Sequence, residues 1–338
     1  MLDWIVSHSR VLFDETLGLF VDPRQRVFWP CLLISALVAV IALVLGRRGR
    51  PGKLRFVLRF LLDRRVWLHP SSLLDLRLLV ANVVIRALLV APLGLSAYAL
   101  ALALVSGLDG WIGAPAPSSL SPAAVTGLYT AVLFVAWDGS RYLLHRLAHE
   151  VPFLWELHKV HHSAEVMAPF TFFRVHPVER FLFGLRGVLV TGLVTGVFFY
   201  AFRERAVQAE LLGVNVVGFV FNAIGSNLRH PDVGVSYGPW LERIFMSPAQ
   251  HQIHHSVEPA HYNSNYGVWL AVWDWLGGSL RVTGFAREPL RFGLEGEDLN
   301  HDPHGLASSI LEPLATAPRR LHRAGSSGAL AAGQGGSP

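Results

Sequence analysis

Long apolar runs constrain the fold of this chain more than any other feature of its sequence. Residues 27–46 form the first run, and twenty residues in a helix are enough to cross a bilayer core of about 30 Å. A second run, 76–105, is long enough to span with a tilt or with a kink at Pro92. Further apolar segments follow at 122–137, 181–202 and 207–224. The sequence therefore predicts an all-α integral membrane protein with four to five membrane-embedded helices.

The composition supports a membrane protein and argues against other classes. Hydrophobic residues make up 52% of the 338 residues and charged residues only 16%, whereas soluble domains carry about 25% charged residues. A single cysteine, Cys31, excludes a disulfide framework. The basic residues border apolar runs and form no long polar face, so we expect no nucleic-acid partner. Residues 1–26 lack the pattern of a cleavable signal peptide and are expected to form an interfacial segment.

The distribution of positive charge predicts the orientation. Eight Lys or Arg residues lie between Arg47 and Arg65, and none lies between Ser106 and Ser121. The positive-inside rule places the basic loop 47–65 in the cytoplasm and 106–121 outside. Segments 181–202 and 207–224, separated by Arg-Glu-Arg, read as a membrane hairpin 181–224 that returns the chain to its starting side. Both flanks of this hairpin are therefore expected on the cytoplasmic face of the membrane.

Histidines are concentrated in three spaced clusters in this cytoplasmic part. The chain has sixteen histidines, and eight of them occur as His145-x-x-x-His149, His158-x-x-His161-His162 and His251-x-x-His254-His255. Positions i, i+3 and i+4 of a helix share one face, so each cluster can direct two or three imidazoles at one point. Imidazole suits zinc, copper, iron and nickel. The pattern predicts a metal site that holds two ions, bound mainly by nitrogen because Cys31 is remote.

With these clusters and spans, the chain from Asp138 to about Gly284 resembles the fatty acid hydroxylase superfamily, also called the sterol desaturase family. The matching motifs are His145-Arg-x-x-His149-Glu150, Leu154-Trp155-x-x-His158-x-x-His161-His162-Ser163, Arg174-x-His176-Pro177-x-Glu179, Asn227-Leu-Arg-His230, Ser247-Pro248-x-x-His251-x-x-His254-His255, Asn265-Tyr266-Gly267 and Trp273-Asp274.

The resemblance implies an integral-membrane oxygenase with two iron ions that hydroxylates or desaturates a lipid with O2. The implied metal ligands are His145, His149, His158, His161, His162, His251, His254 and His255, with His230 as a ninth. Electrons are expected from an external donor, a cytoplasmic ferredoxin or b-type cytochrome, because the sequence shows no haem or flavin motif.

The region of the Asn227-Leu-Arg-His230 motif, the third His-bearing region of the family, departs from the family pattern. Many relatives carry His-Ser-Asn where this chain has Gly225-Ser226-Asn227. Either His230 takes over this role or the region supplies a single ligand. His176 is expected to bond a metal ligand and not the metal itself, with a role as a tenth ligand as the alternative. Glu150 is the candidate catalytic carboxylate, as a hydrogen-bond partner or bridge of the metals, with a plain helix cap as the alternative. Asp138 and Asp274 are expected to orient histidines as hydrogen-bond acceptors.

The expected organisation has four parts. These are an interfacial segment 1–26, transmembrane helices in 27–137, a His-cluster domain 138–290 that forms a cytoplasmic helical cap and includes the hairpin, and a C-terminal segment 291–338 that is disordered after about 313. The competing functions are a membrane zinc-dependent hydrolase, which would need fewer histidines and a general base, and a metal transporter, which would place its ligands in mid-membrane. The lipid substrate and the choice between hydroxylation and desaturation stay open.

Overall fold

The computed structural model describes residues 16–22, 25, 27–46, 63–203, 220–221, 225–231, 233–283, 290–299 and 301–333. Their regular structure is helical, apart from two isolated bridges, Phe245–Leu270 and Ser256–Phe292, so the all-α prediction is confirmed. The α-helices are α2 (Trp29–Gly46), α4 (Arg64–Trp67), α5 (Pro70–Ile85), α6 (Ala97–Ile112), α7 (Pro122–Glu150), α8 (Pro152–His162), α9 (Pro177–Phe202), α11 (Gly238–Leu241), α12 (Pro248–His254), α13 (Val272–Gly277) and α14 (Leu306–Gly333). Short 3-10 turns lie at Ala91–Leu93, Thr171–Phe173, Ser226–Leu228, Pro259–His261 and Gly296–Asp298.

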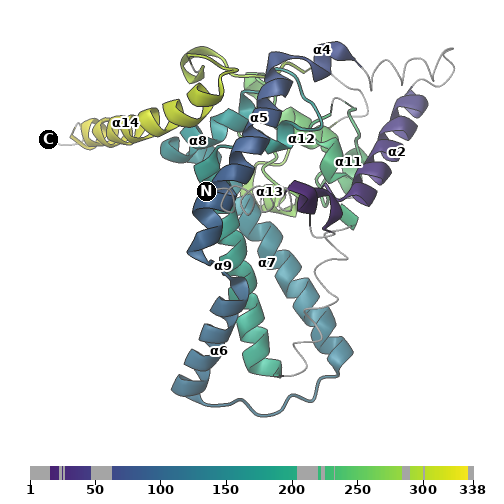
Figure 1. Ribbon diagram of the computed structural model, residues 1–338, viewed down its shortest axis with the longest axis vertical. Helices are drawn as coiled ribbons and strands as arrows, with labels where there is room; N and C mark the ends of the chain where they lie inside the picture. The colour runs from purple at the N-terminus through teal and green to yellow at the C-terminus, as the bar shows by residue number, and fades with distance from the viewer. Residues whose placement is uncertain are drawn as a thin grey trace, which may run out of the picture.

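Helices α6, α7 and α9 extend from one end of a helical cap that contains α8, α12 and α13 (Figure 1). Helix α9 packs between α6 and α7. Gly192 and Gly196 of α9 allow the close approach to α6, because a Cβ atom on Gly192 would lie 2.9 Å from the carbonyl oxygen of Ala97. Small residues four positions apart are a common device for close packing of membrane helices.

The outer faces of these three helices carry apolar side chains, as expected for contact with lipid. Leu102 of α6, Leu128 and Val135 of α7, and Leu189 and Leu193 of α9 are all exposed. Two described segments, Pro70–Ile112 and Pro177–Phe202, are long and apolar enough to cross a membrane. The total of four to five membrane-embedded helices stays a prediction.

The segment Pro70–Ile112 is broken near Pro92, where the sequence predicted a kink. Helix α5 is followed by a π-turn at Arg86–Val90 and a 3-10 turn at Ala91–Leu93. Gly94 then adopts a left-handed conformation with a φ of 60°, which glycine tolerates without strain. Ser96 caps the next helix by accepting a hydrogen bond from the amide of Ala99. The break separates α5, beside the cap, from α6 (Figure 1).

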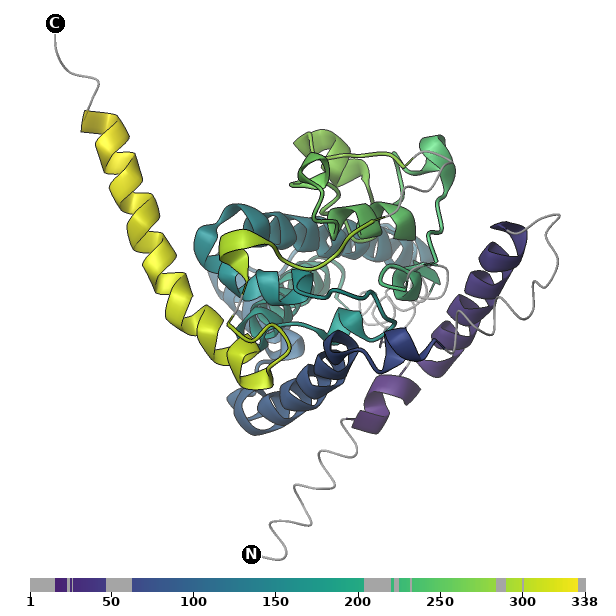
Figure 2. The same ribbon diagram turned by 90° about the horizontal axis from the view of Figure 1, so that it is seen from above.

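The first apolar run forms helix α2, which lies beside the cap and away from the lower ends of α6, α7 and α9 (Figures 1 and 2). Ala39 and Leu43 on one side of α2 pack against Leu228 and Val233. Its other side exposes large apolar residues, Leu37 among them. The predicted helix is therefore present, and its crossing of the bilayer stays a prediction.

The C-terminal segment differs from the sequence prediction of disorder after about residue 313. Helix α14 continues through Pro313 and Pro318 to Gly333 (Figure 2). Residues 306–320 are ordered because they pack on α8, with Pro313 and Ala317 buried. The predicted interfacial segment at 1–15, the basic run at 47–62 and most of 204–224 lie outside the described residues.

Candidate metal centre

Three helix ends bring the predicted histidines together. His145 and His149 occupy the last two turns of α7, one helical turn apart. After a sharp connection at Val151, Pro152 opens α8, which carries His158, His161 and His162. Helix α12 begins with a capping box, in which Ser247 and Gln250 bond each other's backbone amides, and it presents His251, His254 and His255. His230 comes from the loop after the turn Ser226–Leu228.

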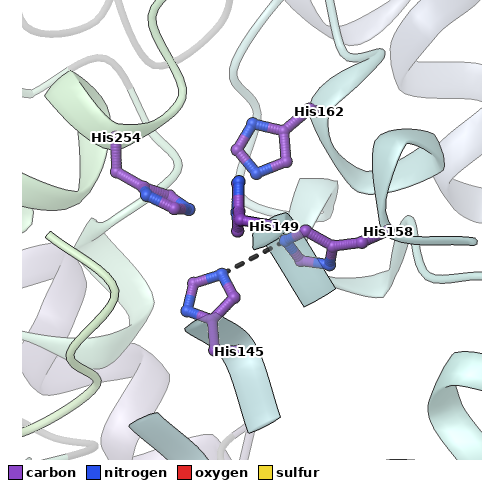
Figure 3. Close-up of side chains that lie close together, drawn as sticks. All are labelled: His145, His149, His158, His162 and His254. Carbon is purple, nitrogen blue, oxygen red and sulfur yellow. Dashed lines mark hydrogen bonds between the residues drawn. The ribbon is translucent and has the colours of Figure 1, made fainter. Parts of the chain in front are cut away.

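The nine predicted ligands fall into two groups with no overlap. The first group is His145, His149, His158, His162 and His254, and the second is His161, His230, His251 and His255. Within each group the ligand atoms lie within 4.8 Å of one another. Figure 3 shows the five rings of the first group arranged around a common centre. The structure thus brings together all nine of these residues in the pattern expected for two ions.

Hydrogen bonds to the outer ring nitrogens fix the tautomers in the first group. His145 donates from Nδ1 to the carbonyl oxygen of Tyr266 (2.7 Å), and His254 donates from Nδ1 to the carbonyl oxygen of Ser264 (2.8 Å). His158 donates from Nδ1 to Oε1 of Glu179 (2.7 Å). In a neutral ring with a proton on Nδ1, the Nε2 atom carries only a lone pair.

These lone pairs face each other in a way that favours a bound cation. The Nε2 atoms of His145 and His158 lie 3.1 Å apart (Figure 3). Two bare lone pairs at this distance repel, and a cation that both atoms coordinate removes the repulsion. In addition, the Nε2 atoms of His149, His162 and His254 are buried and have no hydrogen-bond partner. Buried polar atoms are normally satisfied, so these three nitrogens fit a metal ion.

The ring nitrogens of the second group also face one another at short distances. His161 donates from Nδ1 to the carbonyl oxygen of Arg174 (3.1 Å), which leaves a lone pair on its Nε2 atom. That atom lies 3.3 Å from Nε2 of His230, which is 3.3 Å from Nε2 of His251. Nε2 of His251 is in turn 3.2 Å from Nε2 of His255. Four ring nitrogens therefore converge on one point.

Burial favours the neutral form of several rings of the cap. Burial, and then the nearby histidines, lowers the pKa of His162, His251 and His255 well below the usual value. Burial lowers the pKa of His254 to about 3. A metal ligand must be the neutral imidazole, so the protein holds these residues in the competent state. Nine imidazole nitrogen donors suit iron, zinc, copper or nickel better than magnesium or calcium.

Glu179 is a partner of the site that the sequence analysis did not assign. It lies in the first turn of α9 and is 5% exposed, so its bond to His158 is shielded from water. A carboxylate on the outer nitrogen orients a ligand imidazole and raises its basicity. The residue is part of the Arg174-x-His176-Pro177-x-Glu179 motif, but its contact with His158 spans 21 residues of sequence. Spacing within one helix could not have revealed this contact.

Asp138 and Asp274 bond backbone amides near the histidines and not the histidine rings. Asp274 accepts hydrogen bonds from the amides of Tyr266 and Gly267, and so it holds the carbonyl group that His145 bonds. Asp138 accepts from the amides of Trp269 and Leu270 and from the indole of Trp273. Neither carboxylate bonds a histidine directly. Both instead hold the backbone of residues 265–274 in place.

The remaining predicted residues lie apart from the two groups. Glu150 is paired with Arg146 on the exposed side of α7, with 45% of its side chain accessible. His176 uses both ring nitrogens, since Nδ1 accepts from the amide of Val178 and Nε2 donates to the carbonyl oxygen of Ile310. Asn227 lines a separate apolar cavity of about 400 Å³.

The space beside Gly225 is filled, which explains the departure from the family pattern in this region. A Cβ atom on Gly225 would lie 2.2 Å from the hydroxyl oxygen of Tyr237, so a larger side chain would require Tyr237 to move. The nearby loop instead directs His230 into the second group. The alternative in which His230 replaces the missing histidine therefore agrees with the geometry.

A cavity of about 200 Å³ opens against the histidines. Its lining includes His149, His162 and His254 of the first group and His255 of the second. Trp155, Tyr262 and the segment 293–298 complete its walls. Both groups are therefore accessible from one opening.

Comparison with known proteins agrees with the sequence motifs. Residues 130–279 match the model of the fatty acid hydroxylase family, and all nine histidines lie in this region. The resemblance to this superfamily is therefore confirmed. No solved structure matches the chain significantly.

Curated relatives share the same region. An alkylglycerol monooxygenase of Danio rerio is 28% identical over 146 residues, which are 43% of this chain and 29% of that protein. An ornithine lipid hydroxylase of Rhizobium tropici is 33% identical over 141 residues, covering 41% of this chain and 37% of the relative. A Delta(7)-sterol 5(6)-desaturase of Aspergillus fumigatus is 30% identical over 158 residues, covering 46% and 41%. The alignments thus span less than half of each relative.

Proposed function

We propose that this chain is a membrane-bound, O2-dependent di-iron oxidoreductase that hydroxylates or desaturates a lipid. The match of residues 130–279 to the fatty acid hydroxylase family model supports this proposal. The relatives named above are lipid hydroxylases and a sterol desaturase. Ether lipids, aminolipids and sterols are accordingly the substrate classes to test first.

The observation that carries the proposal is the convergence of nine imidazoles in groups of five and four. Iron bound there would supply the activation of O2 that cleavage of an unactivated C–H bond requires, since no side chain is an adequate oxidant. A hydrolytic zinc ion has three protein ligands and an open position, which two neighbouring groups of five and four histidines do not resemble. A transporter would keep its ligands in mid-membrane, whereas these residues belong to the cap and the adjoining end of α7.

The residues of the chain have separable tasks in this reaction. The carbonyl groups of Tyr266, Ser264 and Arg174 and the carboxylate of Glu179 fix the ring orientations before a metal binds. Burial of the rings excludes bulk water and protons from the reacting centre. The cavity beside His149 and His254 gives access from outside the protein.

We further propose that the metal site faces the cytoplasm and receives electrons from a cytoplasmic ferredoxin or b-type cytochrome. The charge asymmetry between 47–65 and 106–121 supports this orientation, because positive loops stay inside. Reduced electron carriers are available on the same side.

Metal analysis of the detergent-purified protein, combined with O2 consumption on a lipid extract, tests the function. We expect two iron ions per chain and O2 consumption that depends on lipid and on a reduced ferredoxin. Zinc with no O2 consumption would support a hydrolase and contradict the proposal. Lipid profiling of a deletion strain would then identify the substrate as the lipid whose unoxidised form accumulates.

A further inference from the structure

Three arginines gather next to the metal centre, at the end of α7 and α9 that adjoins the cap. Arg141 lies on α7, one helical turn before His145, and Arg186 lies on α9. Arg229 directly precedes His230. Arg141 is close enough to the other two to repel both of them electrostatically. We call these three residues the arginine cluster.

The carboxylates nearest to the arginine cluster are bonded to other groups. Asp138 and Glu179 are its acidic neighbours. Both oxygens of Asp138 accept hydrogen bonds from residues 269–273. Oε1 of Glu179 accepts a hydrogen bond from His158, whereas its Oε2 is buried without a hydrogen-bond partner. Three arginines against two carboxylates leave an excess of one positive charge, and no ion pair joins the cluster to any described residue.

The three guanidinium groups differ in how far the protein satisfies them. Arg186 donates to the carbonyl oxygen of Trp137 (2.9 Å) and to Oγ of Ser140 (2.7 Å), and it stacks on the Trp137 ring at 4.3 Å. Arg141 lies 5.5 Å from the centre of the Phe183 ring and has no hydrogen-bond partner among the described residues. Arg229 is only 4% exposed, and its Nε atom is buried without a hydrogen bond.

A buried cation without a partner destabilises a fold, so its presence calls for an explanation. Guanidinium groups bind carboxylate and phosphate oxygens through paired hydrogen bonds, and acidic membrane lipids carry such groups. Resting on the proposed function, and narrowing its substrate classes to lipids that carry a carboxylate or a phosphate, we propose that the arginine cluster binds the anionic group of an acidic lipid substrate. The substrate is then held by its carboxylate or phosphate beside the metal centre.

Binding of a matched pair of lipids to the full-length, detergent-purified protein tests this inference. The probes are tritiated oleate and tritiated oleyl alcohol, which share one chain and differ in the charged group. We expect oleate to bind at least about tenfold more tightly, in line with the value of hydrogen bonds to charged groups. Equal binding of the two probes would overturn the proposal. Competition by inorganic phosphate at the same affinity as oleate would assign the cluster to a free anion, and would overturn the lipid assignment.

The variants Arg141→Gln and Arg229→Gln should lose this preference, and Arg141→Lys should keep most of it. Arg243→Gln is the matched control, because Arg243 is exposed and lies outside the cluster. Without lipid, Arg229→Gln should unfold at an equal or higher temperature, since an unpaired buried charge is removed. A lower unfolding temperature would show that Arg229 serves the fold, and loss of preference in Arg243→Gln would show a general charge effect. Either result contradicts the proposal.

Iron content separates this inference from the proposed function. The arginine variants should retain the iron of the unaltered protein, because no arginine of the cluster contacts a ligand nitrogen. If the unaltered protein contains no iron, the proposed function fails. If it contains iron and ignores the charge of the lipid, only the present inference fails.

Discussion

At the scale of single residues, the metal centre depends on ring nitrogens that have no other partner. His254→Ala removes one of the five nitrogens of the first group, including a buried Nε2 atom that lacks a hydrogen bond. We expect turnover to be lost and iron to fall from two ions to about one per chain, because the second group is intact. Atomic emission spectroscopy of the purified variant measures this change.

His301→Ala is the matched control for this substitution. His301 is exposed and belongs to neither group, so iron content and turnover should be unchanged. His230→Ala should lose iron and His176→Ala should retain it, since both ring nitrogens of His176 are already bonded. Retention of both irons in His254→Ala or His230→Ala would contradict the assignment of the two groups.

Glu179→Gln tests the carboxylate behind His158. The amide keeps the side-chain shape and can still accept from Nδ1, but it removes the negative charge that raises the basicity of the ring. We expect the affinity for iron to fall by about 10- to 100-fold. Competition with a chelator measures it. Glu165→Gln, at a residue with 45% of its side chain exposed, is the control, and an equal affinity in both variants would remove Glu179 from the site.

The sequence was most informative at this scale. Its i, i+3 and i+4 spacings predicted the helical histidines, because their geometry depends only on the local backbone. His230 followed from the resemblance to the family, as the histidine three residues after Asn227. Glu179 and the carbonyl group of Tyr266 could not be found in this way, since their contacts with His158 and His145 span 21 and 121 residues.

At the scale of elements, helix α8 contributes histidines to the two groups and packs against α14. Glu156, which is fully buried, pairs with Lys159 of the same helix (2.8 Å) and with Arg320 of α14, and it accepts a hydrogen bond from Thr316. Arg174 links the same region to the C-terminal segment by donating to the carbonyl oxygen of Pro303 (3.1 Å). The ligand helix is therefore fixed from behind by a segment outside the family match.

Glu156→Ala should destabilise the protein by about 3–5 kcal/mol, because it leaves the buried Lys159 without its anion. Chemical unfolding followed by tryptophan fluorescence measures the change. Glu156→Leu combined with Lys159→Met should recover much of the loss, since an apolar pair needs no counter-charge. Glu312→Ala, at a partly exposed position of α14, is the control. A double variant no more stable than Glu156→Ala would rule out this explanation.

Over residues 306–320 of α14, the structure differs from the prediction of disorder for a physical reason. The prediction of disorder rested on a composition rich in Ala, Gly and Ser after Pro313. Pro313, Pro318 and the glycines that follow have weak helix propensity, although the alanines favour a helix. Tertiary packing on α8 and the bonds to Glu156 outweigh propensity over residues 306–320. Helix α2 shows the complementary case, because its apolar run predicted a helix but could not predict its place beside the cap.

At the scale of the whole molecule, the predicted topology links the membrane helices to the chemistry. The loop Gly113–Ser121 lies at the far end of α6 and α7 from the cap (Figure 1). If the cap faces the cytoplasm, this loop must lie outside.

Cysteine labelling of intact cells tests this topology. In a Cys31→Ser background, a cysteine introduced at Ser118 should react with a membrane-impermeant thiol reagent, and one at Ser326 should react only after lysis. Full labelling of both after lysis is the control for reactivity. Labelling at Ser326 but not at Ser118 in intact cells would show that the predicted topology is inverted. The metal site would then lie on the side away from its source of electrons.

The hydrogen bonds from the Nδ1 atoms of the histidine rings determine which parts of the site can change during evolution. His145, His161 and His254 each rest on a main-chain carbonyl group, which no substitution of the accepting residue removes. His158 alone among these four rests on a side chain, that of Glu179. Evolution, or a protein engineer, can therefore retune the first group through one replaceable carboxylate, while the other three rings keep their alignment through large changes in sequence.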